Sequence, residues 1–365
     1  MITIDARWLK TSGIGTYLRN TLPGVIEAFP EKEFCLLGTE SVLATLEGAS
    51  RNNVRLVEVN APMYSLAEQL ELKRKIPKET SLFWATHYNI PLLYRGRMMV
   101  TVYDLFHLAM PKLVGGLHKG LYAKVMFNAV RRKASAIITI SHFTKKELVR
   151  FVGEGLQEIH PIHLGVDESW FNIQRANNPY GKPYLLYVGN VKPHKNLSTL
   201  IRAYGSLVDK IPHDLVIIGE KEGFITGDKI VASEAAKLGN RVHFTGYLED
   251  KLMRQYFAHA DVFVFPSLYE GFGLPPLEAI AAGCPVIVSE AASLPEVCGD
   301  AVLYCNPYKY EDIAKKIMEI LNNESLRNEL RNKGIAHAHK FTWEKCCIET
   351  CNVISSLVAN DIDQM

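Results

Sequence analysis

The chain alternates short apolar runs with stretches whose apolar residues repeat at helical spacing. Runs such as AIITI (136–140) and DLVIIG (214–219) are not interrupted by alternating polar residues, as expected of strands covered on both faces in a parallel sheet. This strand–helix alternation predicts right-handed βαβ units and an α/β fold. The predicted strands are 2–5, 34–38, 82–86, 98–104, 136–140, 184–189, 214–219, 241–246, 261–266 and 285–288, and the predicted helices include 195–210, 251–260 and 310–322.

A polar segment, NIQRANNPYGK (172–182), predicts a break between two domains because it lacks an apolar period and contains Asn-Asn-Pro and glycine. We therefore expect one doubly wound domain over 1–172 and a second over 183–342. The final stretch, 343–365, is expected to return to the first domain as a helix. Such sheets bind ligands at the carboxyl ends of their strands, so two in tandem predict crevices that face each other across a central cleft.

Composition adds few restrictions. The 365 residues carry a formal net charge of +2, which is too small to indicate a nucleic acid partner. Residues 1–170 hold 21 basic against 16 acidic side chains, so this half either faces an anionic partner or forms a solvated basic face. The opening MITIDARWLK predicts no signal peptide, and no apolar run approaches the roughly 20 residues of a membrane span. Seven cysteines without a C-x-x-C pair predict a reduced, cytoplasmic protein.

Two carboxylates lie in YEGFGLPPLE (269–278), directly after a predicted strand. The two prolines favour the first turn of a helix, whose free N–H groups attract phosphate. We expect Glu278 in that first turn and Glu270 in the preceding loop, both facing the crevice. One carboxylate could then accept hydrogen bonds from a ribose and the other from a sugar. The alternative is a surface helix whose acidic charge suits the helix dipole.

Two other segments follow predicted strands and open helices. VGNVKPHKNLSTL places Lys195 at a helix start, where its ammonium could meet a pyrophosphate or simply extend into solvent. KTSGIGTYLRN places Gly13 and Gly15 in a tight loop whose amides could face a phosphate. Leu18 occupies the position of the third glycine of a dinucleotide fingerprint, which disfavours a nicotinamide-dependent oxidoreductase.

Together these segments resemble the retaining, nucleotide-sugar-dependent glycosyltransferases of family 4, also called glycosyl transferase group 1. The E-x7-E pattern within GFGLPPLEA is the specific signature, and TISHFTKKEL (139–148), HLGVD (163–167) and SLPEVCGDAVLYCNP (293–307) extend the likeness over nearly the whole chain. The resemblance implies a GT-B fold: two Rossmann-like domains that face a central cleft. The first would be the acceptor-side domain and the second would bind the nucleotide sugar.

The resemblance implies a role for each matching residue. Lys195 would neutralise the β-phosphate of the leaving group, Glu270 would hold the hydroxyls of the donor sugar, and Glu278 would bind the ribose. Backbone groups of the two glycine-containing loops would complete the donor site. The remaining donor contacts expected are Gly13, Ile14, Gly15, Asn190, Lys192, Gly271, Phe272, Gly273 and Leu274.

The family also has a histidine near the reacting carbon, and two positions compete for it. ATHYNIP resembles the segment that carries this residue, which favours His87. TVYDLFHLAMP resembles a nearby segment that often reads His-Asp, but Tyr103 replaces the histidine here and leaves Asp104 and His107.

A second departure concerns the phosphate-binding cations. Many relatives have an arginine directly after the glycine of the lysine segment, and Asn190 stands at that position here. Either Lys192 or His194 takes its place, or the site holds the diphosphate with one cation fewer.

The chemical demand of such a reaction is stabilisation of the departing nucleoside diphosphate as an oxocarbenium-like sugar develops. Lys195, loop amides and a helix N-terminus could meet it without a metal. The D-x-D at Asp361–Asp363 falls in the C-terminal tail, so we expect no metal and no cofactor. The resemblance implies retention of configuration, with the departing phosphate oxygen taking the acceptor proton and His87 orienting the reactants.

The resemblance to bacterial transferases of surface polysaccharide assembly favours GDP-mannose as donor, with UDP-sugars as the alternative. The acceptor would be a saccharide or a lipid-linked saccharide at the inner face of the cell membrane. Basic clusters at 73–75, 131–133 and 145–146 predict either peripheral contact with anionic lipid or solvated faces.

Two other functions share parts of this pattern. A GT-B nucleotide-sugar epimerase would have the same fold and donors but would need no acceptor. A non-enzymatic nucleotide-binding subunit would need a degraded site, whereas both glutamates and Lys195 are present.

Overall fold

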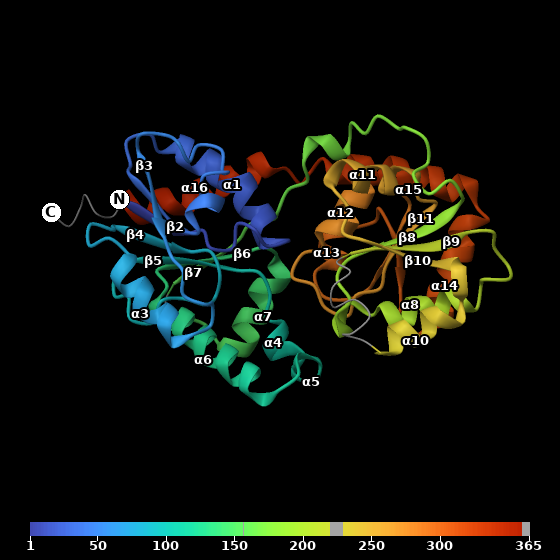
Figure 1. Cartoon of the computed structure of the whole chain (residues 1–365), viewed down its shortest axis with the longest axis horizontal. Coiled ribbons are helices and arrows are strands. Elements are labelled where there is room, and N and C mark those ends of the chain that lie inside the picture. The colour runs from blue at the N-terminus through green and yellow to red at the C-terminus, as the bar shows by residue number, and fades with distance from the viewer. Residues whose placement is uncertain (156, 220–228, 360–365) are drawn as a thin grey trace. The chain divides into compact units, whose positions relative to one another are not determined.

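The computed structural model describes residues 1–155, 157–219 and 229–359. The chain divides into two compact units, each built on its own sheet (Figure 1). The first unit is Met1–Gly165 together with the final segment from Thr342, and the second is Val166–Phe341. The D-x-D of Asp361 and Asp363 lies outside the described residues.

The boundary between the units comes earlier in the chain than the polar segment 172–182. The amide of Val166 donates to the carbonyl of Phe341 at 3.1 Å, within the second unit. The ring of Trp170 lies edge-on to that of Phe257, with centroids 5.2 Å apart. The polar composition of 172–182 therefore marks a largely exposed connection inside the second unit.

The first unit contains a seven-stranded sheet in the order β3-β2-β1-β4-β5-β6-β7, with every neighbouring pair parallel. Sequence analysis predicted the five buried strands and missed β3 and β7. These two are edge strands with only partial burial, so polar residues interrupt their apolar pattern. The strands are β1 (Ile2–Asp5), β2 (Phe34–Gly38), β3 (Val54–Glu58), β4 (Leu82–Ala85), β5 (Met98–Val102), β6 (Ala136–Thr139) and β7 (Glu158–Pro161).

The final helix packs within the first unit against its first helix. The thiol of Cys347 on α16 contacts the carbonyl of Thr21 on α1 at 3.8 Å. A side chain at Gly24 would lie 2.6 Å from that sulfur, so glycine permits the close approach. The helices of this unit are α1 (Ile14–Ala28), α2 (Glu40–Leu43), α3 (Leu66–Lys75), α4 (Phe106–Ala109), α5 (Pro111–Val114), α6 (Leu117–Lys133), α7 (His142–Val152) and α16 (Trp343–Ala359).

The second unit contains a six-stranded parallel sheet in the order β10-β9-β8-β11-β12-β13. Its central strands are fully buried, as their apolar runs predict. The short edge strand β13 was missed. The strands are β8 (Tyr184–Val188), β9 (Asp214–Ile218), β10 (Val242–Gly246), β11 (Val262–Phe265), β12 (Val286–Ser289) and β13 (Leu303–Cys305).

The helices of the second unit follow the predicted ones closely except at 195–210. There, a 3-10 turn (Pro193–Lys195) precedes a shorter helix, α8, because Asn196 adopts a left-handed conformation with φ 59° that separates them. Among the described residues, none of the helices has both the length and the apolar composition that crossing a membrane requires. The helices are α8 (Leu197–Gly205), α10 (Lys229–Lys237), α11 (Asp250–His259), α12 (Leu274–Ala281), α13 (Leu294–Cys298), α14 (Tyr310–Leu321) and α15 (Glu324–Ala338).

Candidate functional site

In the second unit, Lys195 and Glu270 form an ion pair in the loops that follow β8 and β11. The lysine Nζ donates to both carboxylate oxygens, at 2.7 and 2.8 Å. The two side chains are 19% and 12% exposed. Nζ also lies 5.3 Å from the centroid of the Phe265 ring. Sequence analysis expected these residues to contact separate parts of one ligand, and the structure brings them into contact with each other.

Hydrogen bonds from the residues beside Lys195 hold its loop against the segments that follow β11 and β13. The Nδ2 of Asn196 donates to the carbonyls of Pro266 at 3.0 Å and Pro307 at 2.7 Å. The amide of Leu268 donates to the carbonyl of His194 at 2.7 Å. Lys195 ends a 3-10 turn and precedes the first residue of α8 by two positions. This corrects the expectation that it lies at the start of the helix.

A buried serine that sequence analysis missed supports the glutamate loop. The Oγ of Ser293 lies 3.0 Å from the carbonyl oxygen of Glu270 and 2.8 Å from that of Phe272, and its hydroxyl donates to them. The Phe272 side chain is buried beside Phe341, so it belongs to the core and only its backbone remains for a ligand. Ser293 is the first residue of the segment 293–307 that extends the family resemblance, but the sequence analysis assigned it no role.

The segment around Gly273 has a backbone that only glycine adopts easily. Gly273 precedes α12 with φ 110°, and a side chain there would lie 2.7 Å from Leu294. Gly271 is buried and Leu274, the first residue of α12, is partly buried. These residues allow the loop to turn sharply from Glu270 into the helix.

Glu278 lies in the second turn of α12, so its expected place in the first turn is wrong. The helix begins at Leu274, before both prolines, which moves the glutamate one turn along. Burial and, to a lesser extent, the charge of Asp250 raise the pKa of Glu278 to about 7, against the opposing charge of Arg254. Both of these charged residues belong to α11.

Asn190 and Lys192, which were expected to contact the donor, lie in a tight turn after β8. Gly189 has φ 153°, and its amide donates to the carbonyl of Ile218 at 3.0 Å. The amide of Lys192 donates to the carbonyl of Asn190, also at 3.0 Å. Asn190 is partly exposed and Lys192 is exposed, so both are accessible to a ligand.

The glycine loop of the first unit is partly closed on itself. Gly13 has φ 74° and precedes α1, where exposure leaves room for a ligand. The amide of Ile14 donates to Ser12 at 2.9 Å, and that of Gly15 donates to Thr11 at 3.1 Å. A side chain at Gly15 would lie 2.5 Å from the carbonyl oxygen of Leu9, so this glycine serves close packing.

His87 lies two residues after β4, buried between aromatic rings. Its ring centroid is 4.4 Å from that of Trp8 and 4.3 Å from that of Tyr88. The pKa of His87 is lowered to about 3, mainly by burial; the charge of Asp5 opposes the shift, and those of His107 and Arg7 contribute to it. The amide of Asn89 donates to Nδ1 at 3.2 Å. The imidazole is therefore neutral near pH 7 and carries its proton on Nε2, where it can donate one hydrogen bond.

Asp104 and His107, the alternative pair, lie after the neighbouring strand β5. An Asp104 oxygen accepts a hydrogen bond from the amide of Phe106 at 2.9 Å, at the start of α4. The ring of His107 lies 6.2 Å from that of Tyr88, which also stacks near His87. The structure thus brings both candidate histidines to one aromatic cluster.

A buried ionic network beside His87 was not predicted. Arg7 forms two hydrogen bonds with Asp5, at 2.6 and 2.8 Å, and one with Glu68 at 2.5 Å. All three side chains are at most 4% exposed. Asp5 is the charged end of the otherwise apolar run ITID, and Arg7 follows it two residues later, so both stand out in the sequence. Glu68 lies on a polar helix, where nothing distinguishes it from other charged residues.

The two clusters occupy equivalent places in their sheets. In the first unit, Arg7 and His87 follow the adjacent strands β1 and β4, where the strand order reverses. In the second unit, Lys195 and Glu270 follow the adjacent strands β8 and β11, where the order also reverses. Doubly wound sheets bind ligands at this topological switch point, so each unit presents one candidate binding site.

Comparison with known families and proteins agrees with this arrangement. The family model described as "Glycosyl transferases group 1" matches residues 168–337, a range that includes Lys195, Glu270 and Glu278. The O-antigen chain mannosyltransferase B of Escherichia coli is 31% identical over 238 residues, which are 61% of each chain. The O-antigen chain mannosyltransferase RfbU of Salmonella typhimurium is 28% identical over 62% of this chain and 61% of its own. The aligned regions thus span less than two thirds of these relatives.

Other similarities extend over the whole chain. An uncharacterized glycosyltransferase of Methanocaldococcus jannaschii is 28% identical over 97% of this chain and 96% of its own. The structure of sucrose-phosphate synthase from Thermosynechococcus elongatus superimposes with a TM-score of 0.77 at 19% identity, covering 98% of this chain and 99% of that one. WaaG, a glycosyltransferase involved in lipopolysaccharide biosynthesis, gives 0.75 at 15% identity, covering 97% and 100%. These structural neighbours are GT-B glycosyltransferases, so the fold is of that type.

Proposed function

Because residues 168–337 form a Glycosyl transferases group 1 domain, we propose that the chain is a glycosyltransferase that moves a sugar from a nucleotide-sugar donor to a saccharide or lipid-linked saccharide. The observation that carries the proposal is the Lys195–Glu270 ion pair at the switch point of the second unit. The names of the relatives favour mannose, and GDP-mannose is our choice of donor. A UDP-sugar is the alternative.

The ion pair suggests how the second unit handles the donor. In the structure, Glu270 holds Lys195 and satisfies its partly buried ammonium. A bound diphosphate would draw the ammonium to itself and free the Glu270 carboxylate to accept hydrogen bonds from sugar hydroxyls. The positive charge then stabilises the leaving diphosphate. We propose that no metal is needed, and EDTA should leave the rate unchanged. Loss of activity that one divalent ion restores would refute this.

His87 suits an orienting role on the acceptor side. Its pKa of about 3 leaves the imidazole neutral, so it is a poor base at pH 7 and a good donor through Nε2. We propose that the reaction retains configuration and that a departing phosphate oxygen takes the acceptor proton. His87 would then donate a hydrogen bond to a hydroxyl or to a developing oxyanion.

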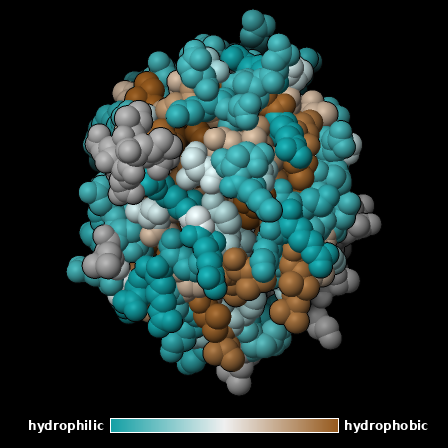
Figure 2. Space-filling view, turned by 90° about the vertical axis from the view of Figure 1, so that its left-hand side faces the viewer, coloured by the Kyte–Doolittle hydropathy of each residue, from teal (hydrophilic) through white to brown (hydrophobic). Residues whose placement is uncertain are grey.

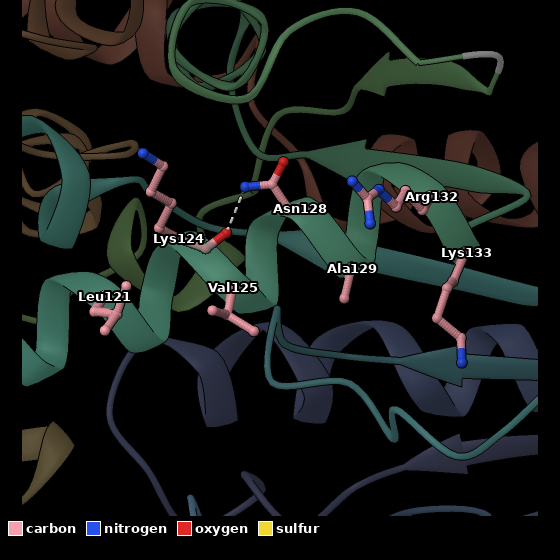
Figure 3. Close-up of a pocket in the computed structure, with 7 residues that line it drawn as sticks. All are labelled: Leu121, Lys124, Val125, Asn128, Ala129, Arg132 and Lys133. Carbon is pink, nitrogen blue, oxygen red and sulfur yellow. Dashed lines mark hydrogen bonds between the residues drawn. The ribbon is translucent and has the colours of Figure 1, made fainter.

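We also propose that the protein acts in the cytoplasm, with the first unit against the inner face of the membrane. On that unit, apolar side chains lie among hydrophilic ones (Figure 2). A groove of about 550 Å³ lies along α6 and is here called the α6 groove. Two of the residues that line it are exposed apolar side chains: Leu121 is 65% exposed and Val125 is 51% exposed. Figure 3 shows Leu121, Val125 and Ala129 on one side of the helix and Lys124, Asn128 and Arg132 on another. Exposed leucine and valine beside lysine and arginine suit an anionic lipid surface.

The central test is the removal of one carboxylate. Glu270→Ala should lower sugar transfer by about 100-fold or more while the protein keeps its circular dichroism spectrum and elutes as the wild type does. The matched control is Glu319→Ala, which breaks the Lys316–Glu319 ion pair of 3.0 Å in the same unit and should leave transfer unchanged. Full activity of Glu270→Ala would show that the donor site is elsewhere.

A further inference from the structure

We propose that Glu68 is a positioning residue that holds Tyr64 and His87 as two walls of one pyranose-binding subsite in the first unit. The inference rests on the proposed function, because it assigns the sugar that this subsite binds. Neither Glu68 nor Tyr64 belongs to the sequence motifs described above. Three hydrogen bonds to one buried carboxylate support the inference.

Glu68 is fully buried and its two oxygens serve different parts of the cluster. One oxygen accepts hydrogen bonds from Arg7 at 2.5 Å and from the Nδ2 of Asn89 at 2.8 Å. The other accepts from the backbone amide of Tyr64 at 2.5 Å. The amide of Glu68 itself donates to the hydroxyl of Ser65 at 3.1 Å, at the start of α3. A buried charge with this many donors is fixed in one position.

The first wall is His87, which Glu68 orients through Asn89. The side chain of Asn89 is held at both ends, by Glu68 and by the hydroxyl of Tyr122. Its backbone amide donates to Nδ1 of His87. That hydrogen bond places the imidazole proton on Nε2, on the side of the ring that Asn89 does not occupy. Glu68 thus determines which ring nitrogen can donate to a ligand.

The second wall is Tyr64, which Glu68 holds in a costly backbone conformation. Tyr64 has φ 65°, a region that bulky residues seldom adopt, and its side chain remains 49% exposed. Its ring centroid lies 6.0 Å from that of Trp8, 6.3 Å from that of His87 and 5.8 Å from that of Tyr122. A strained tyrosine whose ring stays half exposed contributes little to the core, so its position calls for another explanation.

A pyranose matches these two walls. The C–H face of the sugar ring can pack on an exposed aromatic ring, and its hydroxyls can accept a hydrogen bond from Nε2 of His87. His87 is buried beside the ring of Trp8, and a hydrogen bond in such a low-dielectric place is stronger than one in water. Both walls come from the unit whose cluster follows β1 and β4, and both depend on the same carboxylate.

The experiment measures binding of p-nitrophenyl α-D-mannopyranoside to the full chain by calorimetry. Tyr64→Asn removes the ring, and asparagine tolerates positive φ, so the fold is kept. We expect this variant and Glu68→Gln to weaken binding by about tenfold or more, and Tyr64→Phe to stay within about twofold. Asp214→Asn is the control. It removes another buried carboxylate, which bonds Arg241 at 2.5 Å in the second unit, and should lower Tm without changing the affinity.

A spectroscopic measurement separates positioning from general stability. The ¹⁵N shifts of the His87 ring should report the Nε2–H tautomer in the wild type and a mixture of tautomers in Glu68→Gln. The inference is overturned if Tyr64→Asn binds the glycoside as the wild type does, if the wild type does not bind it, or if the tautomer is the same in both proteins. The proposed function fails separately, if the wild type releases no diphosphate from any nucleotide sugar.

Discussion

At the scale of the residue, Glu278 shows how burial decides the charge of a carboxyl group near neutral pH. Burial and, to a lesser extent, the charge of Asp250 raise its pKa from an ordinary value of 4.5 to about 7, and Arg254 opposes the shift. Between these two values, the folded chain holds a proton that the unfolded chain has lost. The folded state is therefore favoured at low pH, and this contribution is lost as the pH rises through 7.

The raised pKa predicts how the stability of Glu278→Gln depends on pH, because this substitution replaces the carboxyl with a neutral group of similar shape. As the pH rises from 5 to 8, the wild type should lose about 1 kcal/mol or more of unfolding free energy relative to the variant. Urea titrations of both proteins at intervals across that range measure the difference. Parallel curves would contradict the raised pKa.

Sequence position could predict which residues follow strands, but not which of them touch. Lys195 and Glu270 were both predicted as site residues, because each follows an apolar run. Their ion pair depends on β8 and β11 being neighbours, which separation along the chain does not reveal. Glu68 was not predicted, since a glutamate on the polar helix α3 has the same pattern whether it is buried or exposed.

At the scale of the element, every buried strand was predicted, whereas of the four edge strands only β10 was. The missed strands β3, β7 and β13 all lie at sheet edges, where one side of the strand has no neighbour. Polar residues are tolerated there, so the uninterrupted apolar run is lost. The start of α8 was misplaced for a local reason, because Asn196 is left-handed and a residue of that type allows it at little cost.

Helix α6 carries the prediction on membranes. The double variant Lys124→Glu, Arg132→Glu reverses two charges of the α6 groove. It should lower binding to vesicles that contain phosphatidylglycerol by about tenfold or more, since each cation near an anionic surface contributes about 1 kcal/mol. Lys315→Glu, on the exposed side of α14 in the second unit, is the control and should have little effect. Co-sedimentation measures the bound fraction, and equal binding by all three proteins would remove the α6 groove from the account.

At the scale of the whole molecule, both units use the same design. Each has a parallel sheet with one reversal of strand order, and each places its polar cluster after the two strands at that reversal. The α/β class and the two-sheet organisation could be predicted, because buried parallel strands give uninterrupted apolar runs. The division at Gly165 could not, since the polar segment 172–182 has the composition of any exposed connection.

The measurement that tests the central claim most directly is nucleoside diphosphate release from a panel of GDP-, UDP-, ADP- and dTDP-sugars, by the wild type and by Glu270→Ala. We predict slow release of GDP from GDP-mannose by the wild type and none above background by the variant. Preference for a UDP-sugar would support the transferase activity but identify a different donor. A changed sugar without diphosphate release would indicate an epimerase. Equal release by wild type and variant, or release by neither from any sugar, would contradict the assignment of the donor site to Lys195 and Glu270.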